Sequence, residues 1–350
     1  MVREDLQRKF DAYWENKAID GIILSLVSHS GVPEEKVTPE KKWCDLDYRM
    51  KRLGEASPTF YADGMPWVFP NFGPGALSAC IGGDFVPAEH TIWFDQAPFI
   101  EDYDKSLPDI RMYEDSRMWR LILDYTQRLA ENSQGKYHVS ITDLGGNLDI
   151  IASLRGTQEL LYDLYDKPQQ VHALIKRVDD LWEWAYDYLY KMLSKYQEGT
   201  TTWFPIWCRG RYYTMQCDFC AMISPEMYKE FVHPSLKRQT EFLDKSLYHL
   251  DGAGQIPHLD QMLQLPRLDA IQWVPGDGAP SVDDPCWFEL YERIQRADKA
   301  LTFWYFGVDM DKYERLVKKL DTSKGVFIQS VCADEKMAKE MMRIAALGNK

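Results

Sequence analysis

The chain has 350 residues, of which 45% are hydrophobic and 27% are charged, and its formal net charge is −13. This is the composition of a folded protein with a sizeable core. The negative balance argues against binding to nucleic-acid phosphates or to an anionic membrane surface, so we expect neither a nucleic acid nor a membrane as partner. It also disfavours a highly anionic substrate.

Three features bear on the compartment. No apolar segment reaches the length that crosses a bilayer. The charged segment 1–10 lacks the apolar stretch of a signal peptide. The seven cysteines are an odd number spread over a long chain, which fits a reducing compartment better than a disulfide framework. We therefore predict a cytoplasmic protein.

Short apolar runs typical of strands recur along the chain, and several precede amphipathic helical patterns. In chain order the expected strands are Gly21–Val27, His138–Leu144, Thr202–Trp207, Ser246–Leu250, Leu268–Val274, Ala300–Phe306 and Gly325–Val331. The expected helices are Pro168–Tyr196, one from Ser224 through Phe242, one that begins at Asp284, Asp311–Leu320 and Asp334–Leu347. Strands that alternate with helices at a period of about thirty residues are typical of parallel βαβ units.

Residues 31–115 are less regular and are rich in Pro, Gly and Asp. We interpret them as an insertion after the first strand that caps the mouth of the fold. No linker divides the chain, and α/β barrels of this length often form one unit. The prediction is an α/β fold, a (β/α)₈ TIM barrel, as a single domain over residues 1–350 with an irregular N-terminal insertion.

Three segments carry a resemblance to a known family. Met215–Glu226 (MQCDFCAMISPE), followed by Phe231–Pro234 (FVHP), resembles the Q-x-D stretch and Ser-Pro-Glu helix start of the uroporphyrinogen decarboxylase superfamily. Leu154–Val171 is similar to another family segment, and Tyr248–Gly252 falls where the family carries His-x-Cys-Gly. The resemblance spans residues 130–345. It implies a TIM barrel with its chemistry at the carboxyl ends of the strands.

Two branches of that superfamily come into question. Its porphyrin decarboxylases hold substrate carboxylates with an Arg-rich N-terminal segment, whereas the first strand here, within GIILSLVSHSG, has no arginine. The other branch contains methyltransferases that serve corrinoid proteins or thiols and bind zinc. The resemblance therefore implies a methyltransferase-like enzyme. No segment reads as a corrinoid-binding domain, so a corrinoid would arrive on a separate protein.

The resemblance also implies a metal site. His249 matches the first zinc ligand of the methyltransferase branch and Cys332 the last, while Asp251 stands where the family has a cysteine. Zinc held by His, Asp and Cys would keep one open position, as catalytic zinc sites do. An oxygen ligand makes the site harder and less suited to a thiolate. Two alternatives stay open: His249 and Asp251 act as acid–base groups without a metal, or they are structural.

Asp218 matches the recurrent acidic position of the family, which the resemblance places in the barrel mouth. There a carboxylate orients a cation or acts as a base, although a turn or cap role is the alternative. Cys217 and Cys220 bracket it as a CxxC pair, and no second CxxC completes a structural zinc site. We interpret them as free thiols rather than as a redox pair. The predicted catalytic residues are Asp218, His249 and Asp251.

Polar and aromatic residues at the strand ends of a barrel often face the ligand, although packing explains many of them equally well. The predicted substrate-binding residues are His29, Trp207, Gln272, Trp273, Tyr305 and Gln329.

Three functions remain in competition. The first is a methyltransferase-like enzyme that moves a methyl group between a small substrate and a corrinoid protein or thiol. Aromatic residues around acidic groups would suit a methylammonium compound. The second is a decarboxylase or lyase that acts on a neutral small molecule, such as a sugar-like one, by Asp and His acid–base chemistry. The third is a barrel that binds a ligand or partner without catalysis. Family barrels often pair, so a homodimer is a further expectation.

Overall fold

The computed structural model describes residues 2–29, 32–94 and 98–349. The strands are β1 (Ile23–Ser28), β2 (Thr59–Ala62), β3 (Trp67–Val68), β4 (Val86–Pro87), β5 (Ile92–Trp93), β6 (His138–Val139), β7 (Tyr212–Met215), β8 (Lys245–Asp251), β9 (Ala270–Val274), β10 (Ala300–Trp304) and β11 (Val326–Val331). The α-helices are α1 (Glu4–Trp14), α2 (Pro39–Cys44), α3 (Leu46–Glu55), α4 (Tyr103–Ser106), α5 (Arg117–Ser133), α6 (Asn147–Arg155), α7 (Thr157–Asp166), α8 (Pro168–Leu193), α9 (Pro225–Met227), α10 (His233–Phe242), α11 (Leu259–Leu263), α12 (Phe288–Arg296), α13 (Met310–Lys319) and α14 (Glu335–Ala345).

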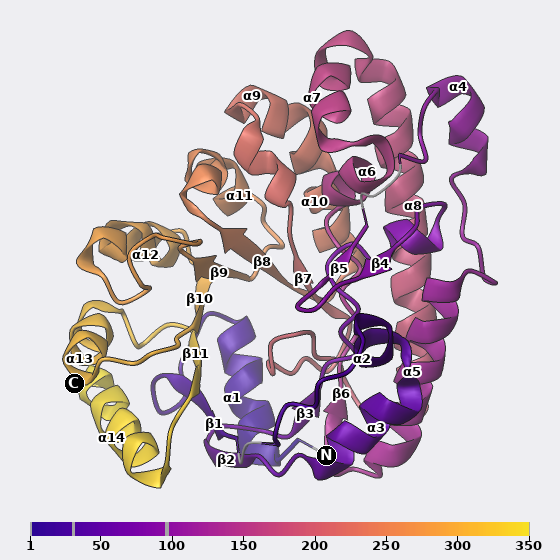
Figure 1. Cartoon of the computed structure of the whole chain (residues 1–350). Helices are drawn as coiled ribbons and strands as arrows, with labels where there is room; N and C mark the ends of the chain where they lie inside the picture. The colour runs from indigo at the N-terminus through magenta and orange to yellow at the C-terminus, as the bar shows by residue number, and fades with distance from the viewer. Residues whose placement is uncertain (1, 30–31, 95–97, 350) are drawn as a thin grey trace.

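One large sheet organises the molecule. Its seven strands follow the order β2-β1-β11-β10-β9-β8-β7, and every neighbouring pair is parallel except β1 with β2. Helices α11 to α14 lie along the outer side of this curved sheet (Figure 1). The predicted α/β architecture with parallel βαβ units is therefore confirmed.

The predicted closed barrel is not present as a continuous ladder within the described ranges. Beyond β7 and β2 the strands form two separate pairs, β3 with β6 and β4 with β5. Isolated hydrogen bonds connect these pairs to their neighbours: the Ile141 amide after β6 donates to Thr201 before β7 (3.0 Å), and the Asp63 amide after β2 donates to Leu24 of β1 (2.9 Å). Two-residue strands such as β3 and β6 are too short to complete the ladder, so this correction concerns closure and not fold class.

Helix α1 covers the amino-terminal ends of the strands. Its Phe10 and Trp14 are buried, and their rings contact Phe327 at the start of β11 (6.3 Å) and Tyr212 at the start of β7 (4.8 Å). The hydroxyl of Tyr13 lies 2.6 Å from that of Thr302 on β10. This end of the sheet is packed shut, which leaves the carboxyl ends of the strands for a functional site.

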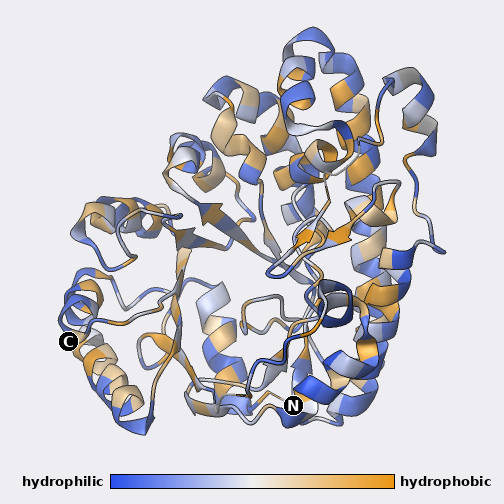
Figure 2. Ribbon diagram, viewed as in Figure 1, coloured by the Kyte–Doolittle hydropathy of each residue, from blue (hydrophilic) through white to orange (hydrophobic). Residues whose placement is uncertain are grey.

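The helices form where capping and periodicity predict them. Asp309 accepts two backbone N–H bonds at the start of α13, and Asp334 accepts one at the start of α14. Hydrophilic and hydrophobic residues share each of these helices, with the apolar ones turned to the sheet (Figure 2). In the part of the chain that the structure covers, no helix combines the length and the apolar character needed to cross a bilayer.

Two sequence predictions are wrong in detail. Residues 202–207 do not form a strand, because Pro205 removes a backbone donor; the strand here is β7, whose Tyr212–Met215 was not predicted. The helix expected from Ser224 through Phe242 is α9, a π-helical turn over Tyr228–Val232, and α10. Pro234 lacks the N–H that a regular α-helix would bond there, which accounts for the wider turn before it.

A buried carboxyl links three helices on the outer layer. Asp179 of α8 accepts a hydrogen bond from Ser235 of α10 (3.0 Å) and another from the Asn147 amide of α6. Burial raises the pKa of Asp179 to about 7, although the Ser235 hydrogen bond and the charge of Arg238 oppose that shift. The other charged groups that act on it are Glu183 and Asp180, and both raise its pKa.

Asp179 should make the protein less stable as the pH rises from 4 to 7. Over this range the folded carboxyl still holds its proton, whereas the unfolded one, with an ordinary pKa of 3.8, has released it. Replacing Asp179→Asn keeps the shape and removes the titration. We expect a flatter dependence of melting temperature on pH than in the wild type. The exposed Asp124→Asn on α5 is the matched control; an unchanged slope in Asp179→Asn would refute this account.

Candidate functional site

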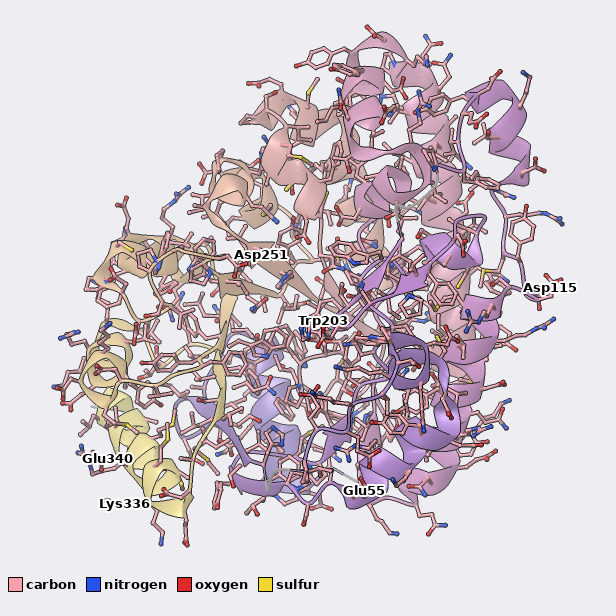
Figure 3. The ribbon with its side chains drawn as sticks, viewed as in Figure 1. Glu55, Asp115, Trp203, Asp251, Lys336 and Glu340 are labelled. Carbon is pink, nitrogen blue, oxygen red and sulfur yellow. The ribbon has the colours of Figure 1, made fainter. Side chains whose placement is uncertain are left out.

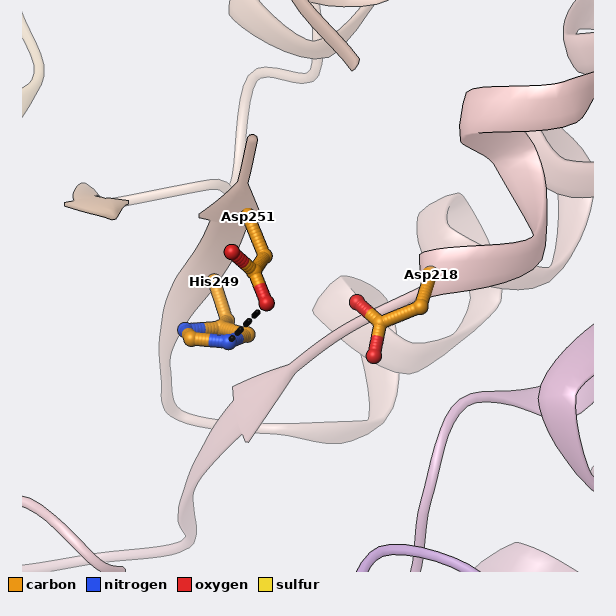
Figure 4. A group of neighbouring side chains, drawn as sticks. All are labelled: Asp218, His249 and Asp251. Carbon is orange, nitrogen blue, oxygen red and sulfur yellow. Dashed lines mark ion pairs between the residues drawn. The ribbon is translucent and has the colours of Figure 1, made fainter. Parts of the chain in front are cut away.

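Three chemically active side chains meet at the carboxyl ends of β7 and β8. His249 and Asp251 lie two residues apart near the end of β8, so strand alternation points both to the same face. Asp218 follows β7 in a short 3₁₀ turn. One ligand atom from each of the three lies within 4.8 Å of the others. Figure 4 shows the three side chains converging from the two neighbouring segments.

The ring of His249 is held in one orientation. Strand pairing sets His249 opposite Gln272 of β9, and Nδ1 bonds the Gln272 side-chain oxygen. When the ring is neutral and Nδ1 is the donor, the lone pair is on Nε2. This Nε2 lies 3.7 Å from Asp251 Oδ2. Trp203 packs edge-on against the ring at 6.2 Å; Trp203 and Asp251 are labelled in Figure 3.

The charges around His249 decide its proton affinity. Burial acts to lower the pKa of His249, but Asp251, Asp218 and the Gln272 hydrogen bond together raise it above its ordinary value. Asp218 reaches solvent, yet it lies in a concave wall. Desolvation there raises the pKa of Asp218, the nearby His249 opposes this, and Asp251 adds to it. The carboxylates therefore favour a positive charge between them.

Two further carboxyls, Asp149 (half-buried) and Asp143 (buried), lie next to this group and were missed by the sequence reasoning. Asp149 at the start of α6 accepts the backbone N–H groups of Asp218 (3.1 Å) and Phe219 (2.8 Å). Burial, and then the charge of Asp218, raise the pKa of Asp149. Asp149 thus fixes the turn that carries Asp218.

Asp143 is the second of these carboxyls, and it is buried. It accepts bonds from the Gly145 amide (2.8 Å), the Tyr213 hydroxyl and the Gln216 amide (both 3.1 Å). Burial raises its pKa to about 6. Asp143 lies inside the segment His138–Leu144 that was expected to be a strand. Its position near the carboxyl end of that expected strand is the sequence feature that could have marked it as a candidate site residue.

Two cavities adjoin the group. One, of about 450 Å³, is lined by Asp218 and Asp149, the segments Pro74–Gly75 and Thr91–Phe94, and further residues of α6, α7 and the turn after β7. The other, of about 430 Å³, is lined by Asp251, the loop after β9 and Trp304–Phe306. Asp218 and Asp251 therefore each line a different cavity.

The predicted metal ligand Cys332 does not join the group. It is buried beside β1, where its amide donates to Val27 (2.9 Å), and Asp218 takes the third place near His249 and Asp251. The expected set of His249, Asp251 and Cys332 is thus not brought together in the described structure.

The predicted substrate-binding residues are scattered. Gln272 contacts His249, and Tyr305 lines the second cavity while its hydroxyl donates to Asp283. Trp273 is fully buried and packs on Trp287 (4.9 Å), because alternation turns it to the helix side of the sheet.

The other three lie away from the group or at its margin. Gln329 accepts the indole N–H of Trp304 (2.7 Å). His29 is exposed just past the end of β1. Trp207 is buried before the start of β7, where its indole donates to the Glu198 carbonyl (2.9 Å) and its own carbonyl accepts from Trp14. Trp207 therefore lies toward the α1 end of the sheet, opposite the site.

Comparison with known proteins gives a fold and no family. No family model matches the chain, and no curated protein matches it. Among solved structures it is similar to a methyltransferase from Methanosarcina mazei, with a TM-score of 0.58 and 11% identity, over 99% of this chain and 99% of that one. The chain therefore shares an α/β fold with a methyltransferase over its whole length.

Replacing Asp149→Asn should loosen the turn that carries Asp218. An asparagine accepts only one of the two N–H bonds and turns its own NH₂ toward the other. We expect a loss of about 1–3 kcal/mol in the free energy of unfolding, measured by urea denaturation. Asp334→Asn, which keeps its single capping bond at α14, should cost almost nothing. Equal stability of the two variants would contradict the role given to Asp149.

Proposed function

We propose that this protein is a methyltransferase-like enzyme of the uroporphyrinogen decarboxylase superfamily that uses a divalent metal at Asp218, His249 and Asp251. It moves a methyl group between a small substrate and a second molecule, a corrinoid protein or a thiol. The observation that carries the proposal is the approach of the three ligand atoms to within 4.8 Å at the carboxyl ends of parallel strands.

The donor chemistry of the three residues fits a divalent ion. Two carboxylates and one imidazole leave open positions for a reactant, as catalytic sites do. The Nδ1 bond from His249 to Gln272 is the outer contact that orients metal-binding histidines, and it leaves Nε2 free to bind. With Asp218 in place of Cys332 the set is richer in oxygen, which favours a harder ion such as Mn²⁺ more than a thiolate-rich site does, while His and carboxylate ligands remain suitable for Zn²⁺. Such an ion would lower the pKa of a bound thiol, alcohol or water.

The protein's own residues supply positioning. Asp149 holds the turn of Asp218, and β8 holds His249 and Asp251, so the three arrive pre-oriented. The two cavities on either side of the group support transfer between two molecules rather than reaction of one. Residues 74–75 and 91–94 of the proposed insertion line the first cavity, which supports a capping role for segment 31–115.

One observation favours the alternative, a decarboxylase or lyase that acts on a neutral small molecule such as a sugar-like one. Asp143 is buried, and its pKa of about 6 lets it gain or lose a proton near neutrality. In that enzyme Asp218, His249 and Asp251 would be acid–base groups without a metal. The corrinoid partner, the homodimer and the cytoplasmic location remain predictions in either case.

Metal content tests the main proposal. Protein purified without chelator, and then incubated with Zn²⁺ or Mn²⁺ and desalted, should hold about one ion per chain by mass spectrometry. His249→Ala and Asp218→Asn should lose it, because each removes one of three ligands. Cys332→Ser should retain it.

The outcomes separate the candidates. Loss of metal in Cys332→Ser would restore the ligand set expected from the family resemblance and refute the one proposed here. A wild type that binds neither ion would end the metal-dependent proposal and leave the acid–base enzyme. Circular dichroism of each variant checks that the fold is retained.

A further inference from the structure

The cavity beside Asp218 combines apolar walls with acidic groups. Its described lining has no lysine, arginine or histidine. The aromatic and sulfur-containing side chains in it are Trp93, Phe94, Phe219 and Met222, and its two ionisable groups are Asp149 and Asp218. A volume of about 450 Å³ is within the range of small-molecule sites.

The aromatic wall needs a glycine beside it. Phe94 packs so closely against Gly75 that an added Cβ there would come within 2.5 Å of its ring. Trp93 is 52% exposed although it is a large apolar residue, and Met222 is 50% exposed. Exposed aromatic surface at the rim of an acidic cavity is the arrangement that binds organic cations.

The carboxylates at the cavity are not paired with a lysine or arginine among the described residues, and the basic group near Asp218 is the His249 imidazole, which does not line the cavity. In the ranges that the structure describes, neither Asp149 nor Asp218 forms an ion pair with a lysine or arginine, and Asp218 accepts only a long bond from Gln255 (3.4 Å) among side chains. An anionic substrate would be repelled, whereas a cation would replace the missing partner.

We propose that the cavity lined by Trp93, Phe219 and Asp218 binds a small methylated ammonium compound. The ammonium lies against the aromatic wall, beside the carboxylates of Asp149 and Asp218. This inference rests on the proposed function in that it takes the reactants to be bound beside Asp218. Recognition of the cation, however, requires neither turnover nor a bound metal.

Three probes of matched shape test the proposal by calorimetry on the full-length protein. Choline has both the cation and the oxygen. In 3,3-dimethyl-1-butanol a carbon replaces the nitrogen, and tetramethylammonium lacks the oxygen. We expect choline and tetramethylammonium each to bind at least about tenfold more tightly than the carbon analogue, because the positive charge is what the cavity recognises. Equal binding of choline and its carbon analogue, or no binding of choline at millimolar concentration, would overturn the proposal.

Variants locate the site. Trp93→Ala should weaken choline binding at least about fivefold, and Trp93→Phe should restore most of it, because the aromatic face is what counts. Trp184→Ala is the matched control, since Trp184 is also exposed but lies on α8 outside the cavity. Undiminished binding in Trp93→Ala would place choline elsewhere and refute the assignment.

Titrations with and without added Zn²⁺ or Mn²⁺ keep the two proposals apart. Choline binding without any metal binding supports the cation cavity and ends the metal-dependent transferase. Metal binding without choline binding leaves the transferase and refutes the substrate class.

Discussion

Parallel pairing of β8 with β9 fixes the imidazole on which the candidate site depends. The register places His249 opposite Gln272, and their side chains bond on the inner face of the sheet. Alternation along β8 then brings Asp251 to the same face two residues later. Because two functional groups come from one strand in a packed sheet, their separation is set by backbone geometry rather than by a loop. Asp218 alone needs a separate support, which Asp149 provides.

Negative charge that no lysine or arginine neutralises is the second constraint. Asp143 is buried and Asp149 is half-buried, and both accept hydrogen bonds that compensate for the loss of water: Asp143 from backbone and side-chain donors, Asp149 from two backbone N–H groups. Asp218 and Asp251 keep oxygens free at the cavities. A metal ion between Asp218 and Asp251, or an organic cation against the aromatic wall, would neutralise this negative charge.

The sequence predicts the sheet well where strands and helices alternate regularly. From β8 to β11 each expected strand is present within two residues at either end, because short apolar runs and capping aspartates are local signals. β7 has only four residues, and the longer apolar run 202–207 just before it was predicted as the strand instead. That run does not form a strand, because Pro205 lacks a backbone donor. Closure of a barrel was not predictable from such runs, because it depends on pairing between distant segments.

The site was predicted only as far as local patterns reach. Asp218, His249 and Asp251 could be named because they follow strands and match the family pattern. Asp149 acts through backbone amides 69 and 70 residues away, which no spacing reveals. Cys332 follows a strand just as Asp251 does, but its thiol turns toward Val27 and not toward the group.

The asymmetry of the two cavities bears on the choice between transferase and lyase. The cavity at Asp218 has aromatic walls and two carboxylates, whereas the cavity at Asp251 is formed by the loop Pro275–Val282 and by Trp304 and Phe306. Two compartments of different chemistry, one lined by Asp218 and one by Asp251, are compatible with two different reactants. A lyase acting on one small neutral molecule uses a single compartment, and the carboxylates at Asp218 offer such a molecule no charge complementarity. This is the physical reason for which we propose transfer rather than lysis.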